Sequence, residues 1–487
     1  MNFLGLLTKA LKPIFFILVA RLYGQSLFAL YYISWWSVGE LLSRLAIFGL
    51  QEGLIREVAS YDETPDPEHE ERLYHSIATA LLCTTLLSAI LCSGLFFLAP
   101  WIASSFFKKP ELILPLQWSS MGIFLQSFIV IFLAALRGKR IMRYEVYVRS
   151  LLESIALIGF CLLFFWTLPH SVEAIMAAQV GSFVVGFGAA WIFLTRHFDY
   201  RRILSAFRNL TLNRRMISFS IPQGFFELSN FGVLQLDTLM LAFFIPQEMV
   251  AAYGIASQIA FHLRKIRMSF TQIYAPIVAR LEFDGEIQKL SRTYTHVARW
   301  SLEINLAILG GLWFFKEPLL RLFGEGFTVA ASVLMVLGFG QFINGVVGIS
   351  GNVLLMSGYS GINLFNSLLV AILNVLLNLV LIPRFGMMGA AAATTLSVCA
   401  VSFLSYWQLK RLMKVFFIWR EFTRPALWGG VAFGSGLVSL WLLSFETFKR
   451  GTLWSGLVFL GVYGLFFWKG GFLKHHLSSE SPIQEAS

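Results

Sequence analysis

Apolar segments of about twenty residues follow one another along almost the whole chain, separated by short polar connections. A helix of this length crosses a hydrocarbon core of about 30 Å and satisfies its own backbone hydrogen bonds inside the membrane. The sequence therefore predicts an all-α integral membrane protein with about 14 transmembrane helices. The predicted segments are 2–20, 27–50, 73–100, 112–136, 150–168, 171–195, 217–245, 249–279, 293–315, 327–356, 361–383, 386–409, 423–444 and 451–468.

The distribution of charge agrees with this assignment and predicts an orientation. Charged residues make up 13% of the chain, about half of their usual share in soluble proteins. The net charge of +11 does not indicate a nucleic-acid partner, because the basic residues are concentrated between apolar segments. Connections 137–149, 196–215 and 410–424 carry five or six Lys and Arg each, and they alternate with connections that are poorer in positive charge. The positive-inside rule places these three connections and both termini in the cytoplasm.

A weak internal repeat divides the chain. Residues 24–33 align with residues 246–255 at a constant offset, 253 − 31 = 222. The offset predicts two six-helix lobes related by an internal repeat, followed by two C-terminal helices, with the substrate held between the lobes near the bilayer midplane. The predicted parts are an N-terminal lobe (1–195), a basic cytoplasmic linker (196–216), a C-terminal lobe (217–410), two further helices (411–470) and a cytoplasmic tail (471–487).

Three cations, Arg264, Lys265 and Arg267, lie in the middle of the apolar run 249–277. Each charge costs about 2.5–3.5 kcal/mol at the membrane centre, and Arg264 is about 20 Å from either end of the run, too far to reach the surface easily. We therefore expect this triplet to face water, protein or an anionic ligand. The offset of 222 carries Arg44 to position 266, so both lobes are expected to direct cations into one central cavity.

Two of the candidate cations have an acid four residues away, where side chains of one helix meet. The two pairs are Glu40 with Arg44, and Arg299 with Glu303. Each is either a structural ion pair within its helix or a part of the cavity that takes part in substrate binding or ion coupling.

Glu227, Asn230 and Asp237 share one face of the predicted helix 217–245. These residues are candidates for counter-charges to the triplet, for a proton or sodium site, or for hydrogen bonds to a sugar. Pro222 in the same helix predicts a bend that a rocking transporter could use.

Uncharged polar residues punctuate the predicted helices 327–356 and 361–383, together with many glycines. Packing explains most of them, because small residues let helices approach and amides bond between helices. Gln341, Asn344 and Asn352 are candidates for contacts with sugar hydroxyls.

The sequence has no signal for catalysis, a metal or a cofactor. Gly138-Lys139 lacks the upstream glycine of a phosphate-binding loop, since position 133 is Leu. The four cysteines lie in apolar runs without metal-ligand spacing. We therefore predict a protein that is not an enzyme and has no cofactor or metal.

Three stretches resemble the Wzx-type polysaccharide and O-antigen flippases, the polysaccharide-exporter branch of the superfamily that also contains lipid II flippases and multidrug MATE exporters. They are NVLLNLVLIPRFGMMGAAAATT (374–395), the stretch from Leu236-Asp237 to Ala251-Ala252-Tyr253-Gly254-Ile255-Ala256, and Ala135-Leu136-Arg137-Gly138. The similarity extends over most of residues 10–412. Members usually begin well upstream of the run that resembles residues 10–21, so the first helix is expected to be shortened at its start.

The resemblance implies a flippase that moves an undecaprenyl-diphosphate-linked oligosaccharide across the bacterial inner membrane for cell-surface polysaccharide or lipopolysaccharide synthesis. It further implies membrane lipid, a polysaccharide polymerase and assembly proteins as partners. Related lipid II flippases line their cavity with arginines from the second and eighth helices, which by position resemble Arg44 and Arg264/Arg267. The expected diphosphate-binding group is thus Arg44, Arg264, Lys265 and Arg267.

Two other functions remain open at this point. A drug or cation antiporter of the same fold would need acids to dominate the cavity, and Glu227 and Asp237 are available for this. A membrane-embedded glycan polymerase or ligase would need a large outer loop, whereas the longest predicted outer connections have only about ten residues.

Overall fold

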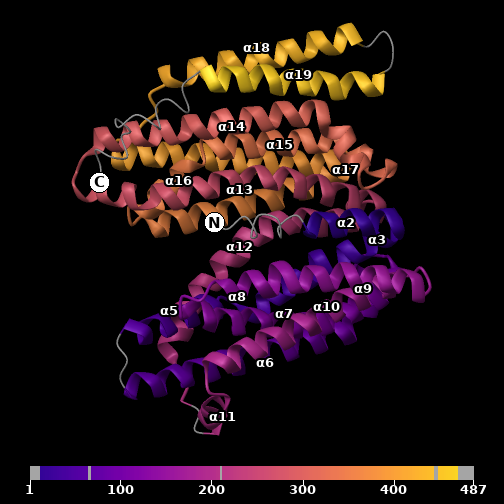
Figure 1. Cartoon of the computed structure of the whole chain (residues 1–487), viewed down its shortest axis with the longest axis vertical. Helices are drawn as coiled ribbons and strands as arrows, with labels where there is room; N and C mark the ends of the chain where they lie inside the picture. The colour runs from indigo at the N-terminus through magenta and orange to yellow at the C-terminus, as the bar shows by residue number, and fades with distance from the viewer. Residues whose placement is uncertain (1–10, 64–66, 209–210, 444–447, 470–487) are drawn as a thin grey trace. The chain divides into compact units, whose positions relative to one another are not determined.

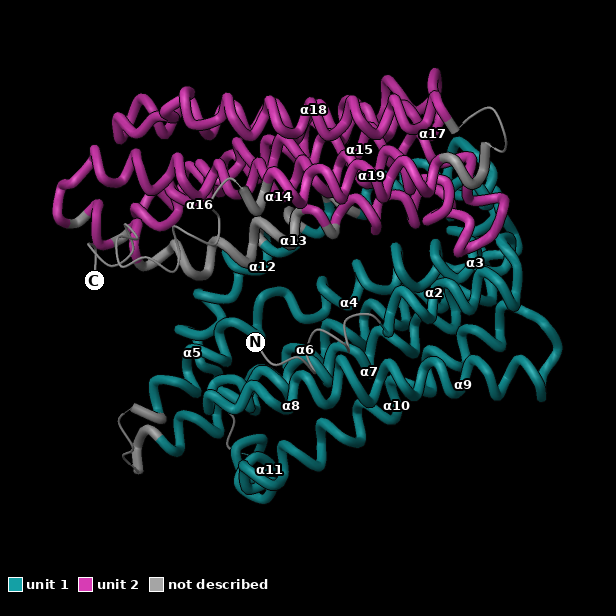
Figure 2. Tube along the Cα trace, turned by 45° about the horizontal axis from the view of Figure 1, so that its top comes forward, with its two compact units in different colours: residues 1–251 teal, residues 252–487 magenta. Residues whose placement is uncertain are grey.

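The computed structural model describes residues 11–63, 67–208, 211–443 and 448–469, and the regular elements in these ranges are all helices (Figure 1). They form two compact units, Met1–Ala251 and Ala252–Ser487 (Figure 2). The predicted all-α fold is confirmed, and every predicted segment is mainly helical wherever the structure describes it.

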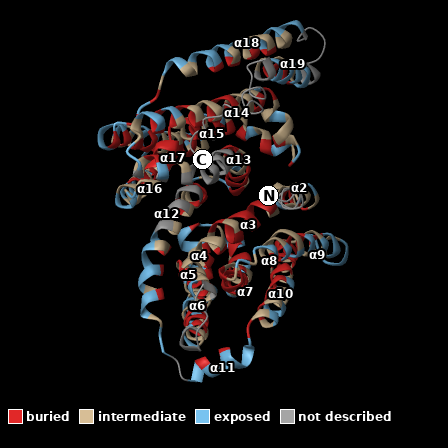
Figure 3. Ribbon diagram, turned by 60° about the vertical axis from the view of Figure 1, so that its left-hand side comes forward, coloured by how far each residue is buried: buried red, intermediate tan, exposed pale blue. Residues whose placement is uncertain are grey.

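Unit 1 is built around α7 (Ile113–Gly138), most of which is buried (Figure 3). α6, α10, α5 and η1 pack around it. The other elements of this unit are α2 (Leu11–Leu22), α3 (Gln25–Tyr31), the π-helical η1 (Tyr32–Gly39), α4 (Glu40–Ile47), α5 (Leu50–Glu63), α6 (Pro67–Trp101), η2 (Ile102–Phe106), η3 (Pro110–Leu112), α8 (Arg143–Glu145), the π-helical η4 (Val146–Leu152), α9 (Glu153–Thr167), α10 (Val172–His197), α11 (Tyr200–Arg208), α12 (Arg214–Phe244) and the start of α13 (Gln247–Phe283).

Helix α12, which was predicted to open the C-terminal lobe, packs within unit 1 against α4 and α5. Glycines permit this close approach. Gly49 has a φ of 74°, and a Cβ atom there would overlap the backbone of Ser220 and Gly224. The two compact units consequently divide near residue 251. The predicted C-terminal lobe, in contrast, begins at residue 217.

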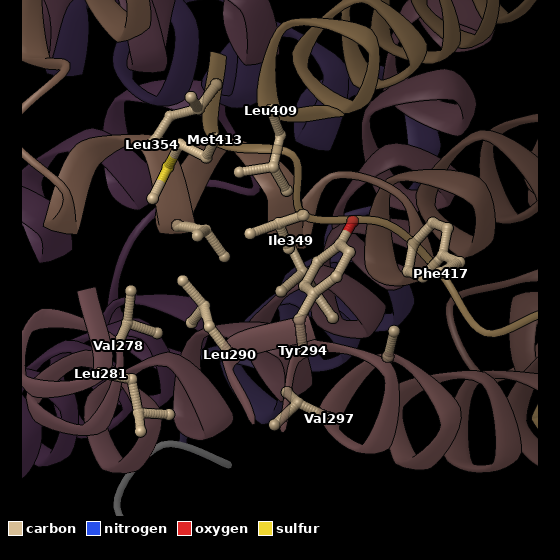
Figure 4. Close-up of a cluster of buried hydrophobic side chains, with 13 residues drawn as sticks. Val278, Leu281, Leu290, Tyr294, Val297, Ile349, Leu354, Leu409, Met413 and Phe417 are labelled. Atoms are coloured by element: carbon tan, nitrogen blue, oxygen red, sulfur yellow. The ribbon is translucent and has the colours of Figure 1, made fainter. Parts of the chain in front are cut away.

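In the described residues, unit 2 consists of the rest of α13, six further α-helices and the 3-10 helix η5. A buried apolar cluster joins α13, α14, α16 and the end of α17, and in it the ring of Tyr294 stacks on that of Phe417 at 4.6 Å (Figure 4). The backbone of Gly386 is non-helical (φ 55°, ψ −130°) and divides α17 where the sequence predicts two separate helices. The elements are α14 (Ile287–Arg321), η5 (Glu325–Ala330), α15 (Ala331–Val346), α16 (Ile349–Met356), α17 (Ser360–Met413), α18 (Arg420–Leu443) and α19 (Phe448–Lys469).

Seven helices of the described residues are long and apolar enough to cross a membrane: Glu70–Phe106, Pro110–Gly138, Arg143–Thr167, Val172–His197, Glu325–Met356, Ser360–Met413 and Arg420–Leu442. The chain is therefore a multi-pass membrane protein. The predicted number of about 14 spans stays a prediction, because several other helices carry more charge or are shorter.

Candidate functional site

A small polar cavity lies inside unit 1, with a volume of about 30 Å³. This is room for about two water molecules and too little for a sugar. Helices α2, α3, α4, α7, α9 and α10 and the segment η1 contribute to its wall. The lining residues are Lys12, Phe15, Phe16, Tyr31, Trp35, Trp36, Glu40, Gln126, Glu153, Ser154, Leu157, Gln179, Ser182 and Phe183.

Both glutamates of this cavity directly follow a π-helical segment. Glu40 comes after η1 (Tyr32–Gly39), and Glu153 comes after η4 (Val146–Leu152). The wider i→i+5 turns of a π-helix change the direction in which all later side chains of that helix project. The two π-helical segments thereby rotate the following helical turns so that the side chains of Glu40 and Glu153 line the cavity.

Glu40 pairs with Arg44, as the spacing of four residues predicts. The distance from Arg44 Nη2 to Glu40 Oε1 is 3.1 Å, and the guanidinium also lies over the ring of Phe231 of α12, 4.2 Å from its centroid. About one third of the Arg44 side chain stays exposed, compared with 15% for Glu40. Arg44 is thus neutralised on one side by Glu40 and still accessible to a further anion.

Glu153 is buried, and its Oε1 atom has no hydrogen-bond partner among the described residues. The Oε1 atom of buried Gln126 also has no hydrogen-bond partner among these residues. Across the cavity, the ammonium of Lys12 lies over the ring of Trp36 at 5.5 Å. Lys12 and Arg149 are close enough to act electrostatically on Glu153. The cluster is therefore a set of opposed charges around a space that water can enter.

The charges of this cluster balance when its third acid is counted. Lys12, Arg44 and Arg149 carry three positive charges, and Glu40, Glu153 and Glu145 carry three negative charges. Arg149 approaches Glu145 at 4.0 Å. Lys12 is exposed, and about one third of the Arg44 and Arg149 side chains is exposed as well.

Two other predicted residues, Glu227 and Asp237, do not line this cavity. Glu227 accepts a hydrogen bond from the Gln51 amide at 2.6 Å, and Asp237 is buried. The side chain of Asn230 lies outside the described residues, and so do those of the triplet Arg264, Lys265 and Arg267, although the backbone of α13 is helical at the triplet. The role of the triplet stays a prediction.

In unit 2, Arg299 is held between two acids. Its Nε atom lies 3.5 Å from Glu303, and its Nη1 atom lies 3.8 Å from Glu421, which also contacts His296 at 3.2 Å. The pair that the spacing predicts is thus present and is extended to α18. This geometry is that of a structural ion-pair network that fastens α18 to α14.

The amides of unit 2 serve mainly to join helices. Asn366 exchanges hydrogen bonds with Gln408 at 2.6 and 3.1 Å, which ties the first part of α17 to its second part. Asn344 accepts a bond from Ser402 at 3.4 Å. Buried Gln341 differs, because its Oε1 atom has no hydrogen-bond partner in the described part of the chain. The predicted sugar contacts remain Gln341, Asn344 and Asn352. Among the described side-chain amides of α15, only Gln341 has a buried oxygen without a hydrogen-bond partner.

Sequence analysis missed Lys12, Gln126, Arg149 and Glu153. Arg149 lies at the end of the basic connection 137–149, which predicts only the orientation of the chain. Glu153 carries a recognisable signal, since it is an ionisable residue near the start of the predicted segment 150–168, where such residues commonly have a function.

Comparisons with known proteins are consistent with this architecture. The family model described as "Polysaccharide biosynthesis protein" matches residues 3–282, more than half of the 487 residues. A second model, MatE, matches residues 222–380.

Two curated proteins illustrate the sequence similarity. A probable low-salt glycan biosynthesis flippase of Haloferax volcanii is 25% identical over 235 residues, covering 45% of this chain and 49% of that protein. The matched part therefore spans only about half of that flippase's length. An uncharacterised membrane protein of Methanocaldococcus jannaschii is 24% identical over 475 residues, covering 92% of this chain and 91% of that protein.

Solved structures share the fold. The inward closed conformation of the lipid II flippase MurJ has a TM-score of 0.72 and 14% identity, covering 96% of this chain and 99% of that chain. An inward-facing multidrug resistance MATE family transporter has a TM-score of 0.70 and 16% identity, covering 82% of this chain and 94% of that chain. At these identities the similarity concerns the fold alone.

Proposed function

The chain belongs to the polysaccharide biosynthesis protein family, and from this premise we propose that it flips a polyprenyl-diphosphate-linked oligosaccharide across the cytoplasmic membrane. Undecaprenol is the expected lipid carrier, and both termini are expected on the cytoplasmic side. The lipid-linked glycan would then pass to a polymerase and assembly proteins outside. The similarity to two proteins of Haloferax volcanii, a probable low-salt glycan biosynthesis flippase and a probable flippase, supports the general assignment.

The observation that supports the proposal is the accessible guanidinium of Arg44, which lies beside Glu40 in unit 1. Lys12 and Arg149 are further basic side chains close to Glu40. The triplet at positions 264–267 adds three cations to the middle of α13. A diphosphate is the part of the lipid-linked glycan that most needs such groups, because it carries its charge into an apolar layer.

We propose that Arg44 and the triplet hold the diphosphate while the prenyl tail stays in lipid. The forked donors of arginine match phosphate oxygens in pairs, and attraction is stronger where water is scarce. The bound oligosaccharide is carried by alternating access, with the repeated halves rocking about the site. Each step in this scheme is binding or conformational change, so the protein needs no catalytic group.

The test is the double variant Arg264→Ala/Arg267→Ala in cells that depend on this protein for surface glycan. We expect glycan display to be lost while insertion into the membrane and thermal stability stay normal. Arg280→Ala is the matched control, because Arg280 is an exposed arginine of the same helix. Full display by the double variant would overturn the role of the triplet.

A second function, a MATE-like antiporter for drugs or cations, is favoured by one observation. Asp237 is buried, and it lies with Glu227 in the region that the MatE family model matches. Proton-coupled efflux of a cationic dye from vesicles that contain the purified protein would support it. The absence of efflux, together with flipping of a polyprenyl-diphosphate glycan, would exclude the antiporter and support the flippase.

A further inference from the structure

A short amphipathic helix lies at the end of a membrane span. α11 begins at Tyr200, three residues after α10 ends at His197, so the chain between them reaches at most about 10 Å. α10 is one of the seven helices that are long and apolar enough to cross a membrane. α11 also packs against α6, at the beginning of another such span. Two independent spans thus locate α11 at the level of one membrane surface.

Contacts at both ends hold α11 in this position. The backbone N–H of Asp199 donates to the Tyr74 hydroxyl at 3.2 Å, and Arg202 forms an ion pair with Glu70. After the helix, the side-chain amide of Asn213 donates a hydrogen bond to the Ser76 hydroxyl at 2.9 Å. All three partners on α6 lie within its first three turns. α11 is therefore fastened along the membrane surface and does not continue the direction of α10.

One exposed stripe of α11 is apolar. Ile203 and Ala206 are buried, whereas Tyr200, Leu204 and Phe207 are exposed, as are the polar residues Arg201, Arg202, Ser205 and Arg208. The exposed apolar side chains follow at spacings of four and three residues, so they form one stripe along the helix. Leu204 is 59% exposed, which is costly in water and favourable at the boundary between headgroups and acyl chains.

Positive charge borders this stripe. Arg201 and Arg208 are exposed and lie seven residues apart, on the same side of the helix. The surrounding segment 196–215 contains six arginines and one aspartate, without Lys or Glu. Long basic side chains beside an apolar stripe can reach phosphates while the stripe enters the membrane boundary.

We propose that α11 binds acidic phospholipids, with Tyr200, Leu204 and Phe207 in the headgroup–acyl boundary and Arg201 and Arg208 on the lipid phosphates. The partner is a lipid surface because the helix lies at the end of two spans, where lipid surrounds the protein. Charge complementarity selects acidic headgroups over zwitterionic ones. This binding is separate from the transported substrate and does not depend on Arg44 or on the triplet.

The experiment uses the full chain in nanodiscs that contain equal amounts of phosphatidylglycerol and phosphatidylcholine. Native mass spectrometry measures which lipids remain bound to the released protein. Each basic residue near a membrane surface changes acidic-lipid binding by about fivefold at low salt. We expect wild type to be enriched in phosphatidylglycerol, and Arg201→Gln/Arg208→Gln to lose most of that enrichment.

Arg384→Gln is the control, an exposed arginine of α17 that is far from α11 in sequence. Leu204→Ser/Phe207→Ser tests the apolar stripe separately and should lower retention of both lipids. Equal retention of phosphatidylglycerol by wild type and Arg201→Gln/Arg208→Gln, with both proteins folded, would overturn the proposal. Retention by wild type without preference between the two lipids would overturn it as well.

Discussion

The side-chain amide of Gln25 donates a hydrogen bond to the backbone carbonyl of Glu248 at 3.0 Å, 223 residues further along the chain. A second bond runs the other way, from the amide of Gln247 to the hydroxyl of Ser26 at 3.2 Å. The offset of 222 pairs Gln25 with Gln247 and Ser26 with Glu248. Gln25 thus contacts Glu248, which is the counterpart of Ser26, and Ser26 contacts Gln247, which is the counterpart of Gln25. Two-fold related surfaces exchange contacts in this way. The predicted repeat pairs these same positions, and it stays a prediction.

These reciprocal bonds predict a conformational effect. Replacing both glutamines, Gln25→Ala/Gln247→Ala, removes two partly buried hydrogen bonds between the starts of α3 and α13, about 0.5–1.5 kcal/mol each. We expect cysteine probes placed beside these bonds to react several-fold faster, because the starts of α3 and α13 then separate more often. The single variants should each give a smaller increase. Unchanged reactivity in the double variant would show that the bonds do not hold these helix starts together.

Lys109 is predicted to stabilise the end of α12. Its ammonium donates to the carbonyls of Ala242 and Ile245, both at 2.9 Å, where a helix C-terminus attracts positive charge. Lys109→Met keeps the length of the side chain and removes both bonds, at a cost of about 1–3 kcal/mol. We expect a Tm in detergent that is lower by several degrees. Lys108→Met, at the exposed neighbouring position, should leave the Tm unchanged.

Arg44 and Glu40 allow a binding role to be separated from a structural one. If Arg44 contacts the diphosphate, Arg44→Gln abolishes transport, whether or not Glu40 is also replaced. If it only neutralises Glu40, which lies 3.1 Å away, the double variant Glu40→Gln/Arg44→Gln recovers transport because no buried charge is left unpaired. We expect no recovery. Flipping of a labelled polyprenyl-diphosphate glycan in vesicles, at matched protein levels, measures the difference.

Gly122 is predicted to be required for packing around Trp35. A Cβ atom at position 122 would overlap the Trp35 ring, which is fully buried and lines the polar cavity. Gly122→Ala should therefore cost about 1–3 kcal/mol and lower the Tm. Gly94→Ala is the matched control, since open space surrounds that position on α6. A Tm that is equally unaffected in both variants would contradict this account of the packing.

Several parts of the fold could be predicted because they depend on local properties of the chain. Runs of apolar residues predict helices of membrane-spanning length, and the two predicted segments 361–383 and 386–409 meet where the structure interrupts α17 at Gly386. Spacing of four residues predicts the pairing of Arg44 with Glu40 and of Arg299 with Glu303. Each of these features involves residues that lie within one or two turns of each other.

The polar cavity could not be predicted in this way. Lys12, Gln126 and Glu153 come from three helices that are far apart in sequence, and η1 and η4 rotate the helices that carry the two glutamates. Apolar periodicity assumes a uniform turn, so it misjudges which side chains project inward after a π-helical segment.

By itself, the sequence determined that the chain is helical and crosses a membrane, because hydropathy is a sum over neighbouring residues and needs no knowledge of distant contacts. Tertiary structure alone decided which charges of different helices meet. Glu153 faces Lys12 in one cavity, and Arg299 reaches Glu421 of α18. Such contacts depend on how the helices pack and on where π-helical turns occur. Helix packing in turn depends on interactions between residues that lie more than one hundred positions apart in the chain.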